Sequence, residues 1–224
     1  MFIKEIAFSS LLLLSSCFIF NKITAQIQFN GGYNNLTIEL SEEMTNEVIN
    51  KDLTGWSFEA AYWFRLKDYR VEFYPGVGIS YLTGENSSLY DEYELNLTHL
   101  FWGTRIYPFT FEDDCMCPTF NKQSGFFEDG FFISLTPHFI FSEQTTRLTA
   151  IEEDQVKSNT YLIDIGAGLD IGISEFLTIT PEFRYRFSGD FDSTLPGVDI
   201  NQTQWNSDLS GWYVGLGIGL RWKN

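Results

Sequence analysis

Apolar and polar residues alternate along most of this chain. The clearest case is residues 176–188, FLTITPEFRYRFS, where every second residue from Leu177 to Phe187 is apolar, aromatic or proline and the residues between them are polar. The same alternation runs through residues 56–66, 70–81, 131–142, 160–173 and 212–222. A period of two residues is typical of a β-strand whose two faces meet different surroundings. The pattern therefore predicts an all-β protein.

Two further segments, 27–40 and 93–108, alternate with a slip in parity. The apolar residues change face near GGYNN, residues 31–35, and near THL, residues 98–100. A β-bulge adds one residue to a strand and so shifts its parity, and we expect a bulge at each place. With these two segments the chain has eight strands, each of about 10–14 residues, whereas a strand tilted by about 45° needs only 9–11 residues to cross a bilayer.

The connections between the predicted strands alternate in length. Four are long, at 41–53, 84–92, 143–158 and 189–209, whereas KDY and SE join other strands tightly. Long loops at one end and tight turns at the other are typical of a transmembrane β-barrel. The exception is the connection 109–129, which by alternation belongs to the tight-turn end and yet is long.

The two faces of the strands differ in charge. The polar face holds acids and arginines in nearly balanced number, together with glycines: Glu59, Arg65, Arg70, Glu72, Glu94, Arg105, Asp164, Asp170, Glu182, Arg184, Arg186 and Arg221. A narrow lumen requires such a face, because buried charges must be paired and the space is tight. The opposite face is almost free of charge and gathers aromatic residues toward its ends, as at the two membrane interfaces: Trp56, Tyr81, Tyr161, Trp212 and Trp222.

A soluble β-barrel or a two-sheet sandwich is the alternative fold for eight alternating strands. In either of them the uncharged face would have to point inward, and the balanced charges and glycines of the other face would have no purpose. Turned outward in water, the uncharged face would form one large apolar patch. We therefore predict an eight-stranded antiparallel up-and-down transmembrane β-barrel over residues 26–224.

The first 25 residues have the order of a secretory signal peptide. Lys4 precedes an apolar stretch from Ile6 to Phe20, and TAQ follows, so we expect cleavage near Ala25. A membrane anchor is an alternative, but it needs about 20 apolar residues. The tetrapeptide LSSC, residues 14–17, resembles a lipoprotein processing site, in which case Cys17 would be acylated. Each reading sends the chain out of the cytoplasm.

Composition alone points away from a membrane protein. The mean hydropathy is −0.11 and the formal net charge is −16, but 17% of the residues are aromatic. The long connections are rich in Asp and Glu, offset by Lys51, Arg147 and Lys157. These acidic connections would form a negatively charged rim at one end of the barrel, which argues against nucleic acid as a partner. Solvated loops without a ligand, or divalent cations bridging to lipopolysaccharide phosphates, both fit. No spacing matches a calcium loop, so we predict no metal site.

With this pattern the chain resembles the small eight-stranded outer-membrane proteins of Gram-negative bacteria, of the OmpA-transmembrane and OmpX type. The resemblance covers nearly all of residues 26–224 and includes the ending YVGLGIGLRWKN, which is similar to the C-terminal signal read by the barrel assembly machinery. Family members usually end on the aromatic residue, whereas Lys223 and Asn224 follow Trp222 here. The resemblance implies an outer-membrane location and contact with lipopolysaccharide and the assembly machinery. It also implies a structural or adhesive role, or an accessory role in secretion or uptake.

The interior of an eight-stranded barrel is just wide enough to be filled by side chains, so we expect a plugged lumen rather than a diffusion pore. Some small barrels modify lipid A, which requires a histidine beside a serine and an acid. His138 has Ser134 and Ser142 four residues away on the same face, and His99 lies where the parity slips. A lone lumen histidine is more often a member of a polar network. We therefore predict no enzymatic activity and no cofactor.

Two cysteines one residue apart, Cys115 and Cys117, lie in FEDDCMCPTF within the 109–129 connection. This connection should face the periplasm, which is oxidising. A structural zinc ion would need two further ligands, and the connection offers only acids. A Cys115–Cys117 disulfide would close a small, strained ring, and we hypothesise that it pins the connection. A periplasmic partner would then dock on this connection.

Overall fold

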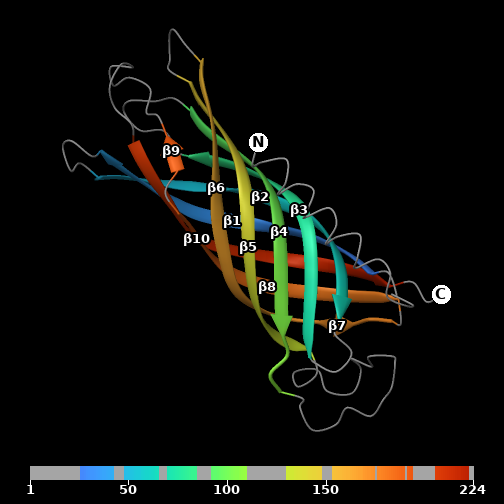
Figure 1. Ribbon diagram of the computed structural model, residues 1–224. Helices are drawn as coiled ribbons and strands as arrows, with labels where there is room; N and C mark the ends of the chain where they lie inside the picture. The colour runs from blue at the N-terminus through green and yellow to red at the C-terminus, as the bar shows by residue number, and fades with distance from the viewer. Residues whose placement is uncertain are drawn as a thin grey trace, which may run out of the picture.

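The computed structural model describes residues 26–42, 48–65, 70–84, 92–109, 130–147, 153–174, 176–189, 191–193 and 205–221. Within them the chain forms ten strands, drawn in Figure 1: β1 (Gln26–Glu42), β2 (Val48–Arg65), β3 (Val71–Gly84), β4 (Glu92–Ile106), β5 (Phe131–Arg147), β6 (Glu153–Leu169), β7 (Ile171–Gly172), β8 (Leu177–Ser188), β9 (Phe191–Ser193) and β10 (Trp205–Arg221). The predicted signal peptide, residues 1–25, and Cys17 within it lie outside the described residues.

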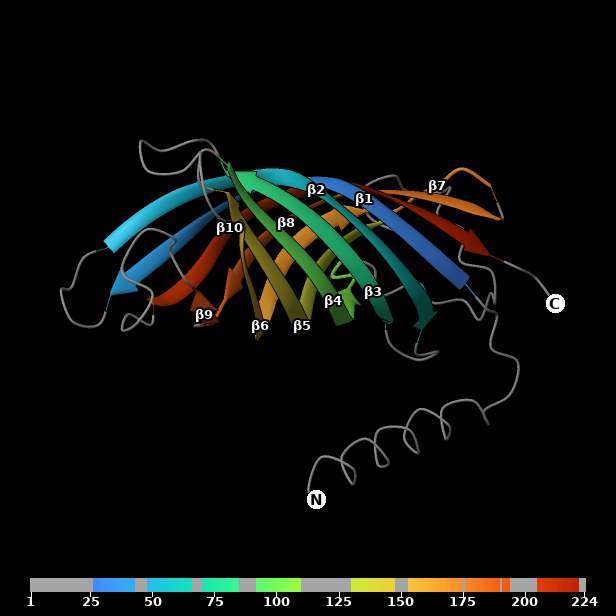
Figure 2. The same cartoon turned by 90° about the horizontal axis from the view of Figure 1, so that it is seen from above.

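The strands close into one antiparallel barrel. Each long strand pairs with its neighbour in the chain, β8 pairs with both β6 and β10, and β10 pairs with β1 from Arg221 opposite Gln26 to Trp205 opposite Glu42. The short β7 continues β6 beyond Asp170, and β9 pairs with the start of β10. Figure 2 shows the long strands curving around a common interior. The predicted eight-stranded antiparallel barrel is confirmed.

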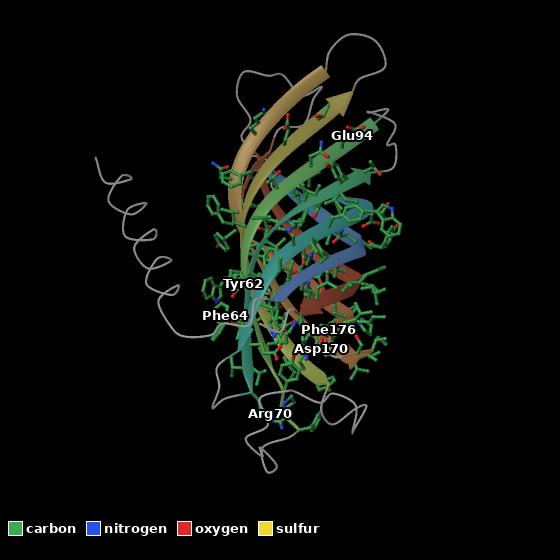
Figure 3. All side chains as sticks on the ribbon, turned by 90° about the vertical axis from the view of Figure 1, so that its right-hand side faces the viewer. Tyr62, Phe64, Arg70, Glu94, Asp170 and Phe176 are labelled. Carbon is green, nitrogen blue, oxygen red and sulfur yellow. The ribbon has the colours of Figure 1, made fainter. Side chains whose placement is uncertain are left out.

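The two ends of the barrel differ. One end holds the start of β1, the end of β10 and the reversal between β7 and β8, and we call it the terminal end. The other holds the junctions of β1 with β2, of β3 with β4 and of β5 with β6, and we call it the loop end. In Figure 3, Arg70 lies at the terminal end and Glu94 at the loop end.

The two expected bulges do not occur. β1 pairs with β2 in one continuous register from Gln26 opposite Trp63 to Ser41 opposite Val48, and β3 pairs with β4 in the same unbroken way. Burial also keeps a single parity along β1, so that Leu36 and Ile38 point inward like Asn34. The apparent slip has another cause: toward the loop end the inward positions change from polar to apolar.

Most strands extend further toward the loop end than alternation predicted. β2 begins at Val48 rather than Trp56, β6 at Glu153 rather than Thr160, and β10 at Trp205 rather than Trp212. The connections there are correspondingly shorter than predicted. The predicted strands were too short because the outward residues near their loop ends are polar, and a polar composition is typical of loops.

Candidate functional site

Most of the charged residues predicted to line the lumen are buried inside the barrel. Those whose side chains the structure buries are Glu59, Glu72, Arg105, Asp164, Asp170, Glu182, Arg184 and Arg186. Arg70 and Arg221 are half-buried near the terminal end. Arg65 occupies an inward position of β2, but its side chain lies outside the described residues.

The prediction for Glu94 is wrong. Burial along β4 follows the odd positions, including Leu95 and Leu97, so Glu94 points outward and is partly exposed. It stands opposite Thr83 on β3 at the loop end. The error follows directly from the expected bulge, which would have turned this residue into the lumen.

Arg184 is the centre of the buried charge cluster. Its Nη1 and Nη2 donate to the two oxygens of Glu59, each at 2.9 Å, in a bidentate pair. Its Nη2 also contacts Glu182, and its Nη1 lies 3.5 Å from Asp164 Oδ2. These four side chains have almost no exposed surface. Since an unpaired buried charge costs several kcal/mol, the guanidinium of Arg184 is what keeps these three buried carboxylates from standing unpaired.

Arg186 contacts two of these carboxylates, Glu59 and Asp164, one step closer to the loop end. Its Nε lies 3.2 Å from Asp164 Oδ2, and its Nη2 lies 3.3 Å from Glu59 Oε1. Both Arg186 and Arg184 also face the ring of Tyr213, at 4.6 Å and 4.8 Å from its centroid. A desolvated guanidinium over an aromatic face is attracted by it, so Tyr213 stabilises both arginines.

The two histidines meet at this level. His138 Nε2 lies 3.2 Å from Asp164 Oδ2, and His99 Nε2 lies 3.7 Å from Glu59 Oε1. Their rings stand edge to face with centroids 5.1 Å apart. The hydroxyl of Ser142 donates instead to the carbonyl of Ser158, at 3.1 Å. Both histidines are thus members of the polar network. The sequence did not predict which face His99 occupies, because the residue lies where the parity slips.

A second polar layer fills the terminal end. The guanidinium of Arg105 lies between the rings of Tyr74 and Phe132, 4.4 Å from each centroid. It donates to Gln28 Oε1 at 2.9 Å and lies 3.4 Å from Glu182 Oε2, which joins this layer to the central cluster. Below it, the hydroxyl of Tyr107 lies 2.6 Å from carboxylate oxygens of both Glu72 and Asp170.

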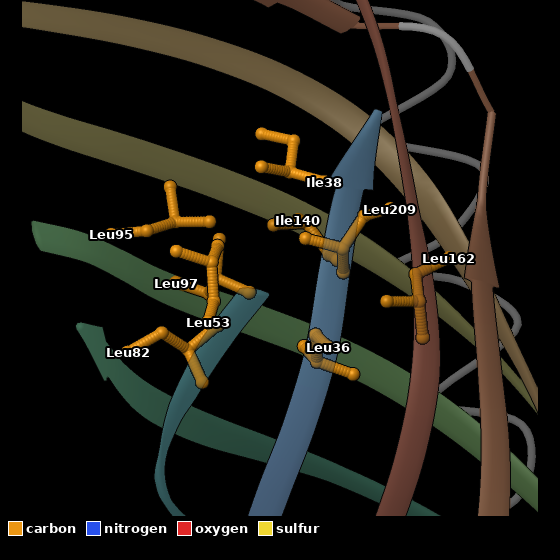
Figure 4. Close-up of a cluster of buried hydrophobic side chains, with 9 residues drawn as sticks. All are labelled: Leu36, Ile38, Leu53, Leu82, Leu95, Leu97, Ile140, Leu162 and Leu209. Atoms are coloured by element: carbon orange, nitrogen blue, oxygen red, sulfur yellow. The ribbon is translucent and has the colours of Figure 1, made fainter. Parts of the chain in front are cut away.

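The loop end of the interior is mostly apolar, although Ser142 and Gln144 of β5 and Thr160 of β6 are also buried there. Nine inward side chains from seven strands pack together there with at most 6% of their surface exposed, and we call them the apolar plug (Figure 4): Leu36, Ile38, Leu53, Leu82, Leu95, Leu97, Ile140, Leu162 and Leu209. The sequence contained a signal for them, since the parity slips in 27–40 and 93–108 mark their inward leucines and isoleucine.

These polar, aromatic and aliphatic layers follow one another along the interior of the barrel. An eight-stranded barrel leaves room for little more than its own side chains, and here charged, aromatic and aliphatic groups occupy that room in turn. Among the described residues, no group of three or more His, Cys, Asp or Glu is placed to hold a metal ion. Cys115 and Cys117 lie outside these residues. No helix of the described chain is long and apolar enough to cross a membrane.

The outer surface of the wall is apolar in the part of the barrel nearer the terminal end. Side chains such as Phe58, Val77 and Leu216 point outward there with about half of their surface exposed. Near the terminal end the aromatic rings of Phe64, Phe73 and Trp102 contact one another at 5.6–6.2 Å. Exposed apolar side chains around a charged, buried interior are the arrangement of a barrel surrounded by lipid. The chain is a transmembrane β-barrel with a salt-bridged interior.

Comparison with known proteins gives neighbours in fold only. No protein-family model matches the sequence, and no curated protein sequence does. The structure is similar to Ail, the attachment invasion locus protein of Yersinia pestis, solved with the heparin analogue sucrose octasulfate, at a TM-score of 0.47 and 10% identity over 88% of this chain and 99% of that chain.

Two further neighbours have comparable scores. Neisserial surface protein A matches at a TM-score of 0.44 and 10% identity over 90% of this chain and all of its own. OprG of Pseudomonas aeruginosa matches at a TM-score of 0.44 and 10% identity over 91% of this chain and 99% of its own. Such low identities and scores say nothing about what this chain binds.

Proposed function

We propose that this protein is a non-conducting outer-membrane barrel of a Gram-negative bacterium that stabilises the envelope or presents its loops to a partner at the cell surface. The observation that carries the proposal is the pairing of an apolar outer band with an interior closed by the Arg184 cluster and the apolar plug. A barrel of this build contributes a rigid wall and the loops it holds, because its interior has no room left for a solute.

The loop end is the surface we assign to the outside of the cell. Most of the acidic excess of the chain lies at this end, in the connections, as at Glu43, Glu85 and Glu152, and on the strand ends beside them, as at Asp52 and Asp208. A negatively charged loop end repels polyanions such as nucleic acid and favours cationic or neutral partners. The lipid-facing band is uncharged and covered by lipid, so we expect the loops to select the partner.

The experiment separates the envelope role from the adhesive role. Cells lacking the chain are compared with cells producing either the full chain or a variant whose loop-end connections 43–47, 85–91, 148–152 and 194–204 are replaced by short Gly-Ser turns. An adhesive role predicts that the variant restores detergent resistance but not attachment to host cells or extracellular matrix. If deletion changes neither property, or if the protein is recovered in the soluble periplasmic fraction, the proposal fails.

A second candidate function rests on the 109–129 connection. It is the one long predicted connection at the terminal end, which we assign to the periplasm, and it contains Cys115 and Cys117. An accessory subunit of a secretion or uptake complex would dock its partner here. Deleting residues 111–128 should then abolish crosslinking to that partner while leaving the heat-modifiable barrel intact. Unchanged crosslinking would dismiss docking at this connection.

A further inference from the structure

The outward face of the barrel changes character part-way up the wall. On seven strands we take the outward-facing aromatic residue that lies nearest the loop end. Together these residues form what we call the outer belt: Tyr33, Trp56, Tyr81, Phe141, Tyr161, Phe187 and Trp212. The belt is continuous from β10 through β1 and β2 to β3. The ring of Tyr33 lies 5.5 Å from that of Trp56 and 6.1 Å from that of Trp212, and Trp56 pairs directly with Tyr81.

Above the outer belt the outward positions are polar. Every outward side chain that the structure describes there is an amide, hydroxyl, acid or lysine: Asn35, Thr37, Glu39, Asn50, Asp52, Thr54, Thr83, Glu94, Asn96, Thr98, Glu143, Thr145, Lys157, Asn159, Asp208 and Ser210. Some of them interact across strands, as when Thr37 Oγ1 donates to Asp52 Oδ1 at 2.8 Å. Below the belt, outward positions are almost all apolar.

The inward face changes in the opposite sense near the same level. Below the belt it carries the charge clusters around Arg184 and Arg105, and near and above it the apolar plug, with the neutral polar side chains of Ser142, Gln144 and Thr160 beside the plug on β5 and β6. Leu53 and Asp52 show the exchange within one strand: the leucine is buried inside and the acid is exposed outside. The polarity of the barrel therefore inverts from that of a membrane protein to that of a soluble one.

Only water explains the upper arrangement. Packing leucines inside gains free energy by removing apolar surface from water, and lipid would provide no such gain. Outward acids such as Glu39 and Asp52 keep their hydration only outside the hydrocarbon, where an ionised carboxylate is stable. A wall with both features belongs above the membrane surface, whereas the wall below the belt belongs in it.

We infer that the outer belt contacts the headgroup layer of the outer leaflet, and that the wall above it is a water-exposed collar folded around the apolar plug. This inference rests on the proposed outer-membrane location. The apolar wall from Phe73 to Tyr81 spans nine residues of β3, or about 20 Å at the usual rise and tilt, near the ~25 Å of barrel bands. From Tyr33 to the end of β1 at Glu42 the collar adds about 20 Å.

The collar enlarges the surface available to a partner. At the end of β1 the loop starts about 20 Å from the headgroups, whereas β3 ends at Gly84, only three residues beyond Tyr81. The hydroxyl, amide and carboxylate groups of the collar wall are reachable beside the loops. The lipid-headgroup and sugar layer is the neighbour that this wall meets first. One side of the collar is incomplete, because β8 ends at Ser188, where the Gly189 nitrogen donates to the Tyr161 carbonyl at 3.2 Å.

Paired cysteine reporters test the boundary. In a background with Cys115 and Cys117 replaced by serine, Thr83→Cys and Val77→Cys place one thiol on each side of the belt, both outward on β3. Intact cells are treated with a membrane-impermeant maleimide. We expect at least tenfold faster labelling at Thr83→Cys than at Val77→Cys. The pair Asp52→Cys and Phe58→Cys repeats the comparison on β2.

The possible results distinguish a failure of the collar inference from a failure of the proposed outer-membrane location. If all four thiols are protected, although urea-unfolded protein labels fully, lipid covers the collar and the inference is wrong while the outer-membrane location stands. If Val77→Cys and Phe58→Cys label as fast as their partners, the wall is not in lipid and the proposed location fails. Heat-modifiable migration of every variant on a gel verifies that each barrel has folded.

Discussion

Three carboxylates surround Arg184, and replacing this residue should therefore affect more than one contact. Methionine in its place would leave Glu59 and Glu182 buried without their main partner. Breaking a buried ion pair from one side typically costs 3–5 kcal/mol, and we expect Arg184→Met to lower the free energy of unfolding by about that amount. Urea unfolding in lipid vesicles, followed by tryptophan fluorescence, measures it.

A matched control is available on the surface. Lys157 pairs with Glu143 at 3.4 Å, but its side chain is largely exposed, and such pairs contribute less than about 1 kcal/mol. Lys157→Met should therefore unfold almost like the unaltered chain. If the two variants lose equal stability, the charge cluster does not hold the interior together.

His138 tests whether the barrel is an enzyme. Its imidazole lies against Asp164 and His99 inside the network, and the nearby Ser142 hydroxyl donates to a backbone carbonyl. A nucleophile needs a base within hydrogen-bond reach, so we propose that the chain does not modify lipid A. Cells carrying His138→Ala should give the same lipid A mass spectrum as cells with the unaltered chain. A mass change that depends on His138 contradicts this proposal.

At the scale of strands, close approach of side chains inside the barrel depends on glycine. A Cβ at Gly78 on β3 would overlap the imidazole of His99 and lie 2.9 Å from Glu59 Cγ, whereas at Gly219 on β10 its nearest neighbour would be Thr178 Cβ at 3.6 Å. Overpacking a filled core costs about 1–3 kcal/mol. We therefore expect Gly78→Ala to lower the urea midpoint and Gly219→Ala to leave it unchanged or slightly raised. Equal midpoints would show that the interior is not filled at Gly78.

The collar and the lipid-facing band should respond differently to the same substitution. Leu53 belongs to the apolar plug with no exposed surface, whereas Leu216 faces outward and is half exposed. Truncation of a buried leucine costs about 2–5 kcal/mol, so Leu53→Ala should destabilise the barrel strongly. For Leu216→Ala, lipid fills the lost contact and the change should be small. Unfolding in vesicles compares them, and the reverse order would contradict the assigned surroundings.

The sequence predicted most elements because each face of a membrane-spanning strand has one character. Where that held, as from Leu177 to Phe187, the strand, its faces and its buried acids and arginines followed from alternation. It failed where the surroundings invert: a bulge was expected at residues 31–35, just before the inward Leu36 and Ile38, and Glu94 was placed in the lumen. Local sequence does not reveal that a strand leaves the bilayer half-way along. Contacts between distant strands, such as Arg184 with Glu59, also depend on the register of the whole barrel.

For the molecule as a whole, the filled interior predicts electrical silence. Two polar layers and the apolar plug occupy the lumen in series, so ions meet both fixed charge pairs and a dehydrated segment. Purified protein added to planar lipid bilayers should insert without producing steady conductance steps. A general porin under the same conditions provides the positive control. Long-lived steps of porin size from this chain would contradict a closed interior.

The collar also sets a requirement for how the protein reaches its place. Its outward acids and amides, Asp52 and Asn50 among them, are stable in water at the cell surface. Before the barrel is inserted, however, these residues are on the periplasmic side of the membrane. Strand tips so polar cannot be pushed singly through hydrocarbon. They have to cross while paired and shielded, which makes the collar, rather than the lipid-facing band, the costly part of the chain to insert.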